Sequence, residues 1–126
     1  MNVFEIFNNI SAELEIDFCS GKIKEVSLNI KGYYDKNFKL QKLPAGFGSK
    51  TLIESENITL IGEAGIPVTH ASHSLFRVSD VIKAIELTEL ETRSKTDWLG
   101  GVDLHHICFE GITRVSKNTY KIQWGS

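Results

Sequence analysis

The sequence predicts an α+β fold, in which a mainly antiparallel sheet built from hairpins has an N-terminal helix and a second helix packed on it. Several short runs alternate apolar and polar residues, as half-buried strands do. Two other segments place apolar residues at helical spacing, and turn-forming residues separate the runs. A chain of 126 residues with this pattern is expected to form a single globular domain over residues 1–126.

The N-terminal segment predicts a helix followed by a hairpin. Apolar residues at helical spacing indicate an amphipathic helix over about residues 2–13. Residues 14–18 then alternate strictly between apolar and acidic side chains, which is typical of a strand. A glycine-containing turn at 19–22 separates this run from a second alternating run at 26–30, so the two runs should pair.

The middle of the chain predicts a second hairpin between two irregular segments. Residues 37–50 contain a proline and two glycines and are expected to form a surface loop. Residues 51–55 and 58–62 are rich in β-branched side chains and are separated by only two residues, so we expect them to pair with each other. Residues 62–74 are expected to be irregular.

The second helix is predicted near residues 79–92. Ser79 and Asp80 carry side-chain oxygens that can accept the free backbone N–H groups of a first helical turn. If this helix continues past its middle, Glu89 and Arg93 form an i,i+4 pair, which stabilises an exposed helix by about 0.2–0.5 kcal/mol.

The C-terminal segment predicts the clearest hairpin. A turn-rich connection at 96–101 leads to a strand over 103–115. Residues 116–118 then form a turn, and a last strand covers 119–124.

Composition excludes several classes of function. The formal net charge of −2 has the wrong sign for a general binder of nucleic acids or anionic membranes, which needs a basic surface. The N-terminus lacks the basic region of a secretory signal, and no stretch is long and apolar enough to span a membrane. The two cysteines are therefore expected to be reduced thiols in the cytoplasm.

The stretch DLHHICFEG, residues 103–111, concentrates the residue types used in metal and acid/base sites. On a strand, a period of two places His105 and His106 on opposite faces of the sheet, and puts His106, Cys108 and Glu110 together on one face. His106 and Cys108 are then side by side on one strand, which does not form the hydrogen-bonded pair that a thiolate nucleophile needs. We therefore expect no catalytic residue, no enzyme activity and no cofactor.

A metal site is the alternative that remains open. The other two histidines, His70 and His73, lie in an irregular segment and could complete a site with His106 and Cys108. This alternative describes a small metal-binding domain or a metal-dependent enzyme. The spacing matches no zinc motif, so a buried cysteine with histidines at the edge of a sheet is the favoured interpretation.

The final segment, DLHHICFEGITRVSKNTYKIQWGS, resembles the C-terminal strands of small bacterial immunity proteins, especially those of contact-dependent growth inhibition systems. The resemblance covers about the last quarter of the chain. The matching residues are His106, Phe109, Glu110, Gly111, Tyr120, Gly125 and Ser126. Within this motif we expect Phe109 to fill the core and Gly111 to relieve the strand at a bulge.

The resemblance implies a cytoplasmic inhibitor that binds a cognate toxin C-terminal domain, of nuclease type, and blocks its active or substrate-binding surface. Such an inhibitor needs aromatic anchors and complementary charge on its binding surface. The residues expected to bind the partner are Tyr33, Tyr34, Glu54, Glu56, Glu86 and Glu89. A domain that binds a small ligand between helix and sheet is a third interpretation, and the sequence predicts no oligomeric state.

Overall fold

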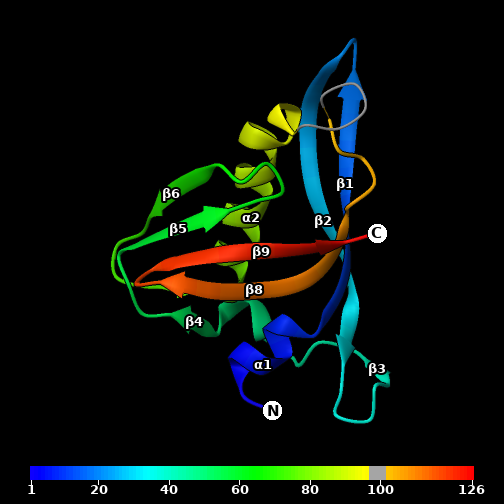
Figure 1. Cartoon of the computed structure of the whole chain (residues 1–126). Helices are drawn as coiled ribbons and strands as arrows, with labels where there is room; N and C mark the ends of the chain where they lie inside the picture. Colours follow the sequence, from blue (N-terminus) through cyan, green and yellow to red (C-terminus); the bar gives the residue numbers. More distant parts are fainter. Residues whose placement is uncertain (97–101) are drawn as a thin grey trace.

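The computed structural model describes residues 1–96 and 102–126 of the chain. A curved sheet of seven strands covers the long helix α2 (Val78–Thr92), and a short helix, α1 (Val3–Asn8), packs at the N-terminal end of the chain (Figure 1). The sheet is mainly antiparallel, so the predicted α+β class is confirmed. Among the described residues, no helix combines the length and the apolar character needed to cross a membrane.

The strands are β1 (Ile10–Cys19), β2 (Lys22–Tyr34), β3 (Leu40–Gln41), β4 (Thr51–Ile53), β5 (Asn57–Ile61), β6 (Pro67–Ala71), β7 (Phe76–Arg77), β8 (Cys108–Ser116) and β9 (Thr119–Gly125). Two 3₁₀ turns, η1 (Phe47–Ser49) and η2 (Arg93–Lys95), complete the described elements. The large sheet has the order β3-β2-β1-β8-β9-β5-β6, while β4 pairs separately with β7. Neighbouring strands run antiparallel except for β5 and β9, which are parallel.

Helix α1 is shorter than predicted, because the chain becomes a strand at Ile10 instead of continuing as a helix to residue 13. Asn2 and Glu5 form a capping box that fixes the start of the helix. From Ile10 to Leu14, every second side chain is buried, and pairing with β2 begins at once. Alternation and cross-strand pairing therefore outweigh the helical spacing that the same apolar residues also satisfy.

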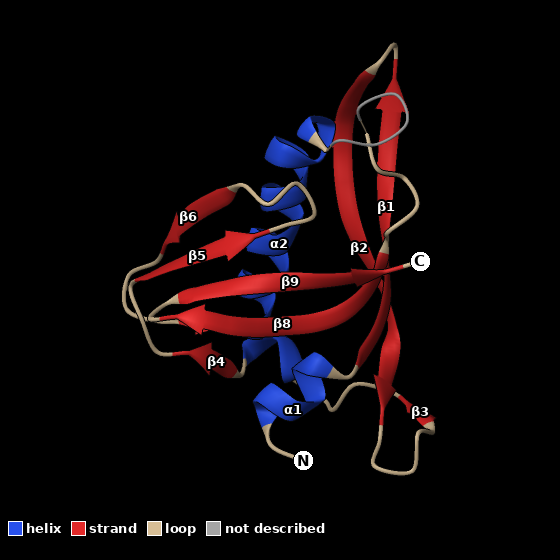
Figure 2. Cartoon of the chain, in the orientation of Figure 1, coloured by secondary structure: helices blue, strands red, loops and turns tan. Residues whose placement is uncertain are grey.

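The first predicted hairpin is confirmed, with a turn at Ser20 and Gly21 between β1 and β2. β1 pairs with β8 only near its start, where Glu13 faces Cys108. Beyond this point β1 and β2 continue as a two-stranded arm that extends past the neighbouring strands (Figure 2).

The second predicted hairpin is wrong. β4 pairs with β7, whereas β5 pairs with β6 and with β9, so the two runs belong to different sheets. A two-residue hairpin turn needs backbone with positive φ, and the residues between these strands do not adopt it. The segment at 62–74, expected to be irregular, supplies β6, and the loop at 37–50 contains β3 and η1.

Helix α2 confirms the second predicted helix, but it begins at Val78, so Ser79 and Asp80 lie inside its first turn instead of preceding it. The Asp80 carboxylate accepts the backbone N–H of Arg77 at 2.8 Å. On the inner side of the helix, Val81 and Ile85 are fully buried against the sheet residues Ile58 and Leu60. These residues belong to one contiguous apolar core between the sheet and the two helices.

The C-terminal hairpin is also confirmed, but β8 begins at Cys108 and not at residue 103. The predicted connection at 96–101 lies outside the described residues except for Thr96. Phe109 is 5% exposed and makes edge-to-face contacts with Phe7 and Trp124, at centroid distances of 5.7 and 5.9 Å. The expectation that Phe109 fills the core is therefore confirmed.

Gly111 forms the predicted bulge in β8. The register shifts between Phe109 and Ile112, which places both of these side chains in the core. Gly111 has a φ of +95°, and a Cβ on it would lie 2.9 Å from Oδ1 of Asn8. The same Asn8 oxygen accepts the backbone N–H of Ile112 at 2.9 Å, so the bulge is held by α1.

Replacing Gly111 with alanine is expected to lower the free energy of unfolding by about 1–3 kcal/mol, because an L side chain is strained at positive φ and displaces Asn8. Urea unfolding measures the loss. Gly21→Ala is the matched control, since Gly21 also has positive φ but nothing lies within 4 Å of its added Cβ. Gly111→Ala should be the more damaging change, and equal losses would show that Asn8 adjusts freely.

Candidate functional site

The segment from Asp103 to His106 is a loop folded around the Asp103 carboxylate. Its Oδ1 accepts the backbone N–H groups of His105 and His106 at 2.8 and 3.0 Å, and its Oδ2 lies 2.7 Å from Nδ1 of His106. Such local bonds compete with strand pairing. The expectation that His105 and His106 point to opposite faces of a strand is therefore wrong, and their rings meet edge to face at 5.4 Å.

Asp103 is nearly inaccessible, and its surroundings favour the ionised form. Burial acts to raise the pKa of this carboxyl group, but the hydrogen bonds from the backbone of His106 and His105 and from the His106 ring outweigh it. The pKa of Asp103 is consequently below its ordinary value.

A fully buried ion pair lies beneath this loop. Nε of Arg93 contacts Oε1 of Glu89 at 2.6 Å, and both side chains are 0% exposed. Nη1 of Arg93 donates to the backbone oxygens of Asp103 and His106, each at 2.8 Å. The guanidinium carbon lies 5.3 Å from the centre of the Trp124 ring. Arg93 therefore joins the end of α2 to the loop before β8 and to β9.

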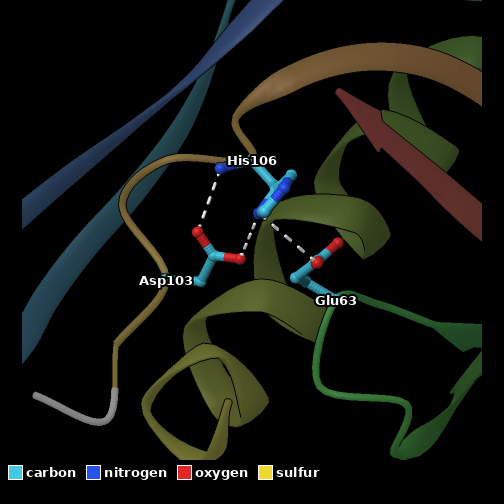
Figure 3. A group of neighbouring side chains, drawn as sticks. All are labelled: Glu63, Asp103 and His106. Carbon is cyan, nitrogen blue, oxygen red and sulfur yellow. Dashed lines mark hydrogen bonds and ion pairs between the residues drawn. The ribbon is translucent and has the colours of Figure 1, made fainter. Parts of the chain in front are cut away.

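Glu63 completes a group of three potential metal ligands with Asp103 and His106. The three side chains come from two loops and point toward one another (Figure 3). Their ligand atoms lie within 4.8 Å of each other, and Oε1 of Glu63 is 3.8 Å from Nδ1 of His106. Burial raises the pKa of Glu63, and the charge of Asp103 raises it further.

His70 is held away from this group by its own hydrogen bond. Its Nε2 lies 2.8 Å from Oγ1 of Thr88, whose hydroxyl proton is donated to the backbone oxygen of Ala84. Nε2 of His70 must therefore be the donor to Thr88, so only Nδ1 of this ring keeps a lone pair that could bind a metal. Burial lowers the pKa of His70, which keeps the ring neutral.

The predicted set of four metal ligands is not formed. His73 is exposed in the connection between β6 and β7, and Cys108 lies half-buried at the start of β8. His70 faces α2, and only His106 lies in a group of ligand atoms. Within residues 1–96 and 102–126, the group of Glu63, Asp103 and His106 is the one with metal-ligand spacing.

The outward face of β1 carries an acidic groove. Two hollows, with volumes of about 510 and 320 Å³, follow one another along this strand. The charged residues that line them are five carboxylates and one lysine: Glu13, Glu15, Asp17, Glu25, Glu110 and Lys31. We call this surface the β1 groove, and Tyr34 lines one of its ends.

The six residues predicted to bind a partner do not form one surface. Tyr34 lies in the β1 groove and is 42% exposed, while Tyr33 packs against the core. Glu54 and Glu56 are exposed in the connection between β4 and β5.

The two predicted residues on α2 have structural contacts. Oε2 of Glu86 accepts the backbone N–H of Leu28 at 2.8 Å and so satisfies the outer edge of β2. Glu89 is 0% exposed and paired with Arg93, so its assignment to a binding surface is wrong. Helical spacing identified this ion pair, but spacing alone does not indicate burial.

Sequence patterns did not indicate Glu63, Asp103 as a ligand, or the acidic side of β1. The alternation in residues 13–17 was visible and correctly indicated a strand. Its outward carboxylates form a groove only because β2 adds Glu25 and β8 adds Glu110. Comparison of the chain with protein-family models, curated proteins and solved structures gave no match.

Proposed function

We propose that this protein is an inhibitor of the immunity-protein kind, which binds a basic surface of a bacterial toxin domain through the β1 groove. The observation that carries the proposal is the concentration of five carboxylates beside one lysine in a molecule whose formal net charge is only −2. Complementary charge of this kind speeds association and disfavours wrong partners.

The pairing of Asp17 with Glu25 supports a role in binding. These two residues lie directly opposite each other on β1 and β2, and both point outward. Like charges in this position destabilise a sheet. A local arrangement that weakens the fold without a compensating contact is typical of a functional surface. A basic partner would neutralise this repulsion when it binds.

Exposed aromatic and apolar side chains, of which Tyr34 lines the groove, suit a protein partner. Tyr34 is 42% exposed, and Phe38, in the turn between β2 and β3, is 86% exposed. Leu40 follows on β3 and is 51% exposed. Exposed aromatic residues beside charged ones are characteristic of residues that dominate binding energy at interfaces.

A nuclease-type toxin would present the required chemistry, because an enzyme that binds phosphates needs a cationic surface around its active site. An acidic inhibitor seated there excludes the nucleic acid by charge and by volume. The protein would act in the cytoplasm, where such a toxin reaches its substrate. The similarity of the C-terminal segment to immunity proteins agrees with this role, and Phe109 and Gly111 serve the fold in that motif.

We expect the gene immediately upstream to encode a toxin-like C-terminal domain, and the experiment that tests this function uses that domain. Expressed alone in a bacterial host, that domain should stop growth, and co-expression with this protein should restore growth. The purified pair should also form a stable complex. A toxic domain that neither binds this protein nor is neutralised by it would contradict the proposal.

A further inference from the structure

We propose that Glu63, Asp103 and His106 form a binding site for Zn²⁺. The site does not depend on the inhibitor role, because none of the three residues lines the β1 groove. Two carboxylate oxygens and one imidazole nitrogen are a donor set that divalent transition metals accept, and zinc ranks above manganese and iron for such ligands.

The spacing of the donor atoms suits a small ion. Ligands held 2.0–2.1 Å from a tetrahedral ion are separated from each other by about 3.3 Å. Nδ1 of His106 lies 2.7 Å from Oδ2 of Asp103 and 3.8 Å from Oε1 of Glu63, so these distances bracket the required one. Zinc would replace the Nδ1 proton that Asp103 otherwise accepts, and side-chain rotations would suffice to equalise the distances.

The charge around the group favours a cation. Two carboxylates are held together, and of the described basic groups, only His106 forms an ion pair with either of them. The guanidinium of Arg93 pairs with Glu89, and its charge acts on Glu63 without forming an ion pair with it. A divalent ion would relieve the repulsion between Glu63 and Asp103, which burial strengthens.

Bonds outside the group fix each ligand in place. Nη1 of Arg93 holds the backbone oxygens of Asp103 and His106, and Oδ1 of Asp103 accepts two backbone N–H groups while its Oδ2 faces His106. The backbone N–H of Glu63 donates to Oε2 of Glu89 at 3.3 Å. Such outer contacts orient metal ligands and raise affinity. The buried ion pair therefore serves as the support of the site.

The site also has an open side. Asp103 is 3% exposed and forms its floor, whereas the side chains of His106 and Glu63 are 31% and 28% exposed. A fourth ligand, water or a group from another molecule, can approach from this side. The same hydrogen bonds would also hold the loop if its only role were structural. Titration with zinc separates a metal-binding role from a purely structural one.

The test is calorimetric titration of the full chain, purified without an affinity tag, with Zn²⁺ alone. We expect one ion per chain, and a Tm that rises by about 10 °C when free zinc exceeds Kd by a hundredfold. Glu63→Gln and His106→Gln should each weaken binding by more than about tenfold. His73→Ala is the control, because His73 is exposed and outside the group, and its affinity should be unchanged.

Each result decides between a zinc site and a loop that is held together by hydrogen bonds alone. Binding that is absent from the wild-type chain, or equal in wild type and Glu63→Gln, would overturn the proposal. Loss of binding in His73→Ala would do the same, since it would place the metal elsewhere. Substitution with Co²⁺ gives a second check that needs no variant. Nitrogen and oxygen ligands produce no thiolate charge-transfer band, and the appearance of that band would show that a cysteine binds the metal and would overturn the proposal.

Discussion

Replacing Arg93 with methionine is expected to lower the free energy of unfolding by about 3–5 kcal/mol, because it leaves the buried carboxylate of Glu89 without its counter-charge. Methionine fills a similar volume, so the loss would come from charge more than from packing. The variant also frees the backbone oxygens of Asp103 and His106, which Arg93 holds. Urea unfolding at neutral pH measures the loss.

The pH dependence of this variant identifies the cause. Burial already raises the pKa of Glu89, and the Arg93 guanidinium opposes that shift. Without Arg93 the pKa of Glu89 in the folded state rises further above its unfolded value. The folded state then binds the proton more tightly, so the variant regains stability as the pH falls and loses it as the pH rises. The deficit relative to wild type should be smaller at about pH 5 than at about pH 8.

The double variant Glu89→Gln, Arg93→Met is the control. It removes the uncompensated charge while keeping an oxygen that can accept the backbone N–H of Glu63. It should be more stable than Arg93→Met alone at neutral pH and should lose the pH dependence. A double variant less stable than the single one would show that an uncompensated charge on Glu89 is not what destabilises Arg93→Met.

Local patterns in the sequence predicted both α-helices, although α1 is shorter than predicted, and the two hairpins that have tight turns. Alternation, capping residues and turn glycines act over a few residues, so β1, β2, β8, β9 and α2 could be identified from them. The pairing of β5 with β6 and β9, and of β4 with β7, depends on contacts between distant segments, which no local pattern records. The mistaken hairpin of residues 51–62 is a direct result.

The residues of the candidate sites were harder to predict for the same reason. The stretch from Asp103 to His106 has the alternation of a strand, but the Asp103 carboxylate captures the neighbouring backbone N–H groups and folds it into a loop. Glu63 lies forty positions earlier and reaches this loop through the connection after β5. A sequence shows which groups can ligate a metal, but the topology of the fold determines which of them lie close together.

Reversing two charges of the β1 groove is expected to weaken toxin binding by about 100-fold or more, because like charges placed across an interface cost several kcal/mol. Glu15 and Asp17 are exposed and line the part of the groove that lies on the arm of β1. Their replacement by lysine should leave the fold intact, since Asp17 repels Glu25 in the native sheet.

The chain offers a control with the same chemistry. Glu54 and Glu56 are likewise two exposed acidic residues separated by one position, and they lie outside the groove. The variants Glu15→Lys, Asp17→Lys and Glu54→Lys, Glu56→Lys shift the net charge by the same amount. Any difference between them therefore reports the position of the charges and not their sum.

The central claim, that the β1 groove is the surface that binds the partner, is tested most directly by the dissociation constants of these two double variants. The purified cognate toxin domain is the ligand, and the constants are measured at near-physiological salt. The account predicts that Glu15→Lys, Asp17→Lys loses about 100-fold or more in affinity, while Glu54→Lys, Glu56→Lys stays within about threefold of wild type. Unchanged affinity in the groove variant, or a larger loss in the control, would contradict it.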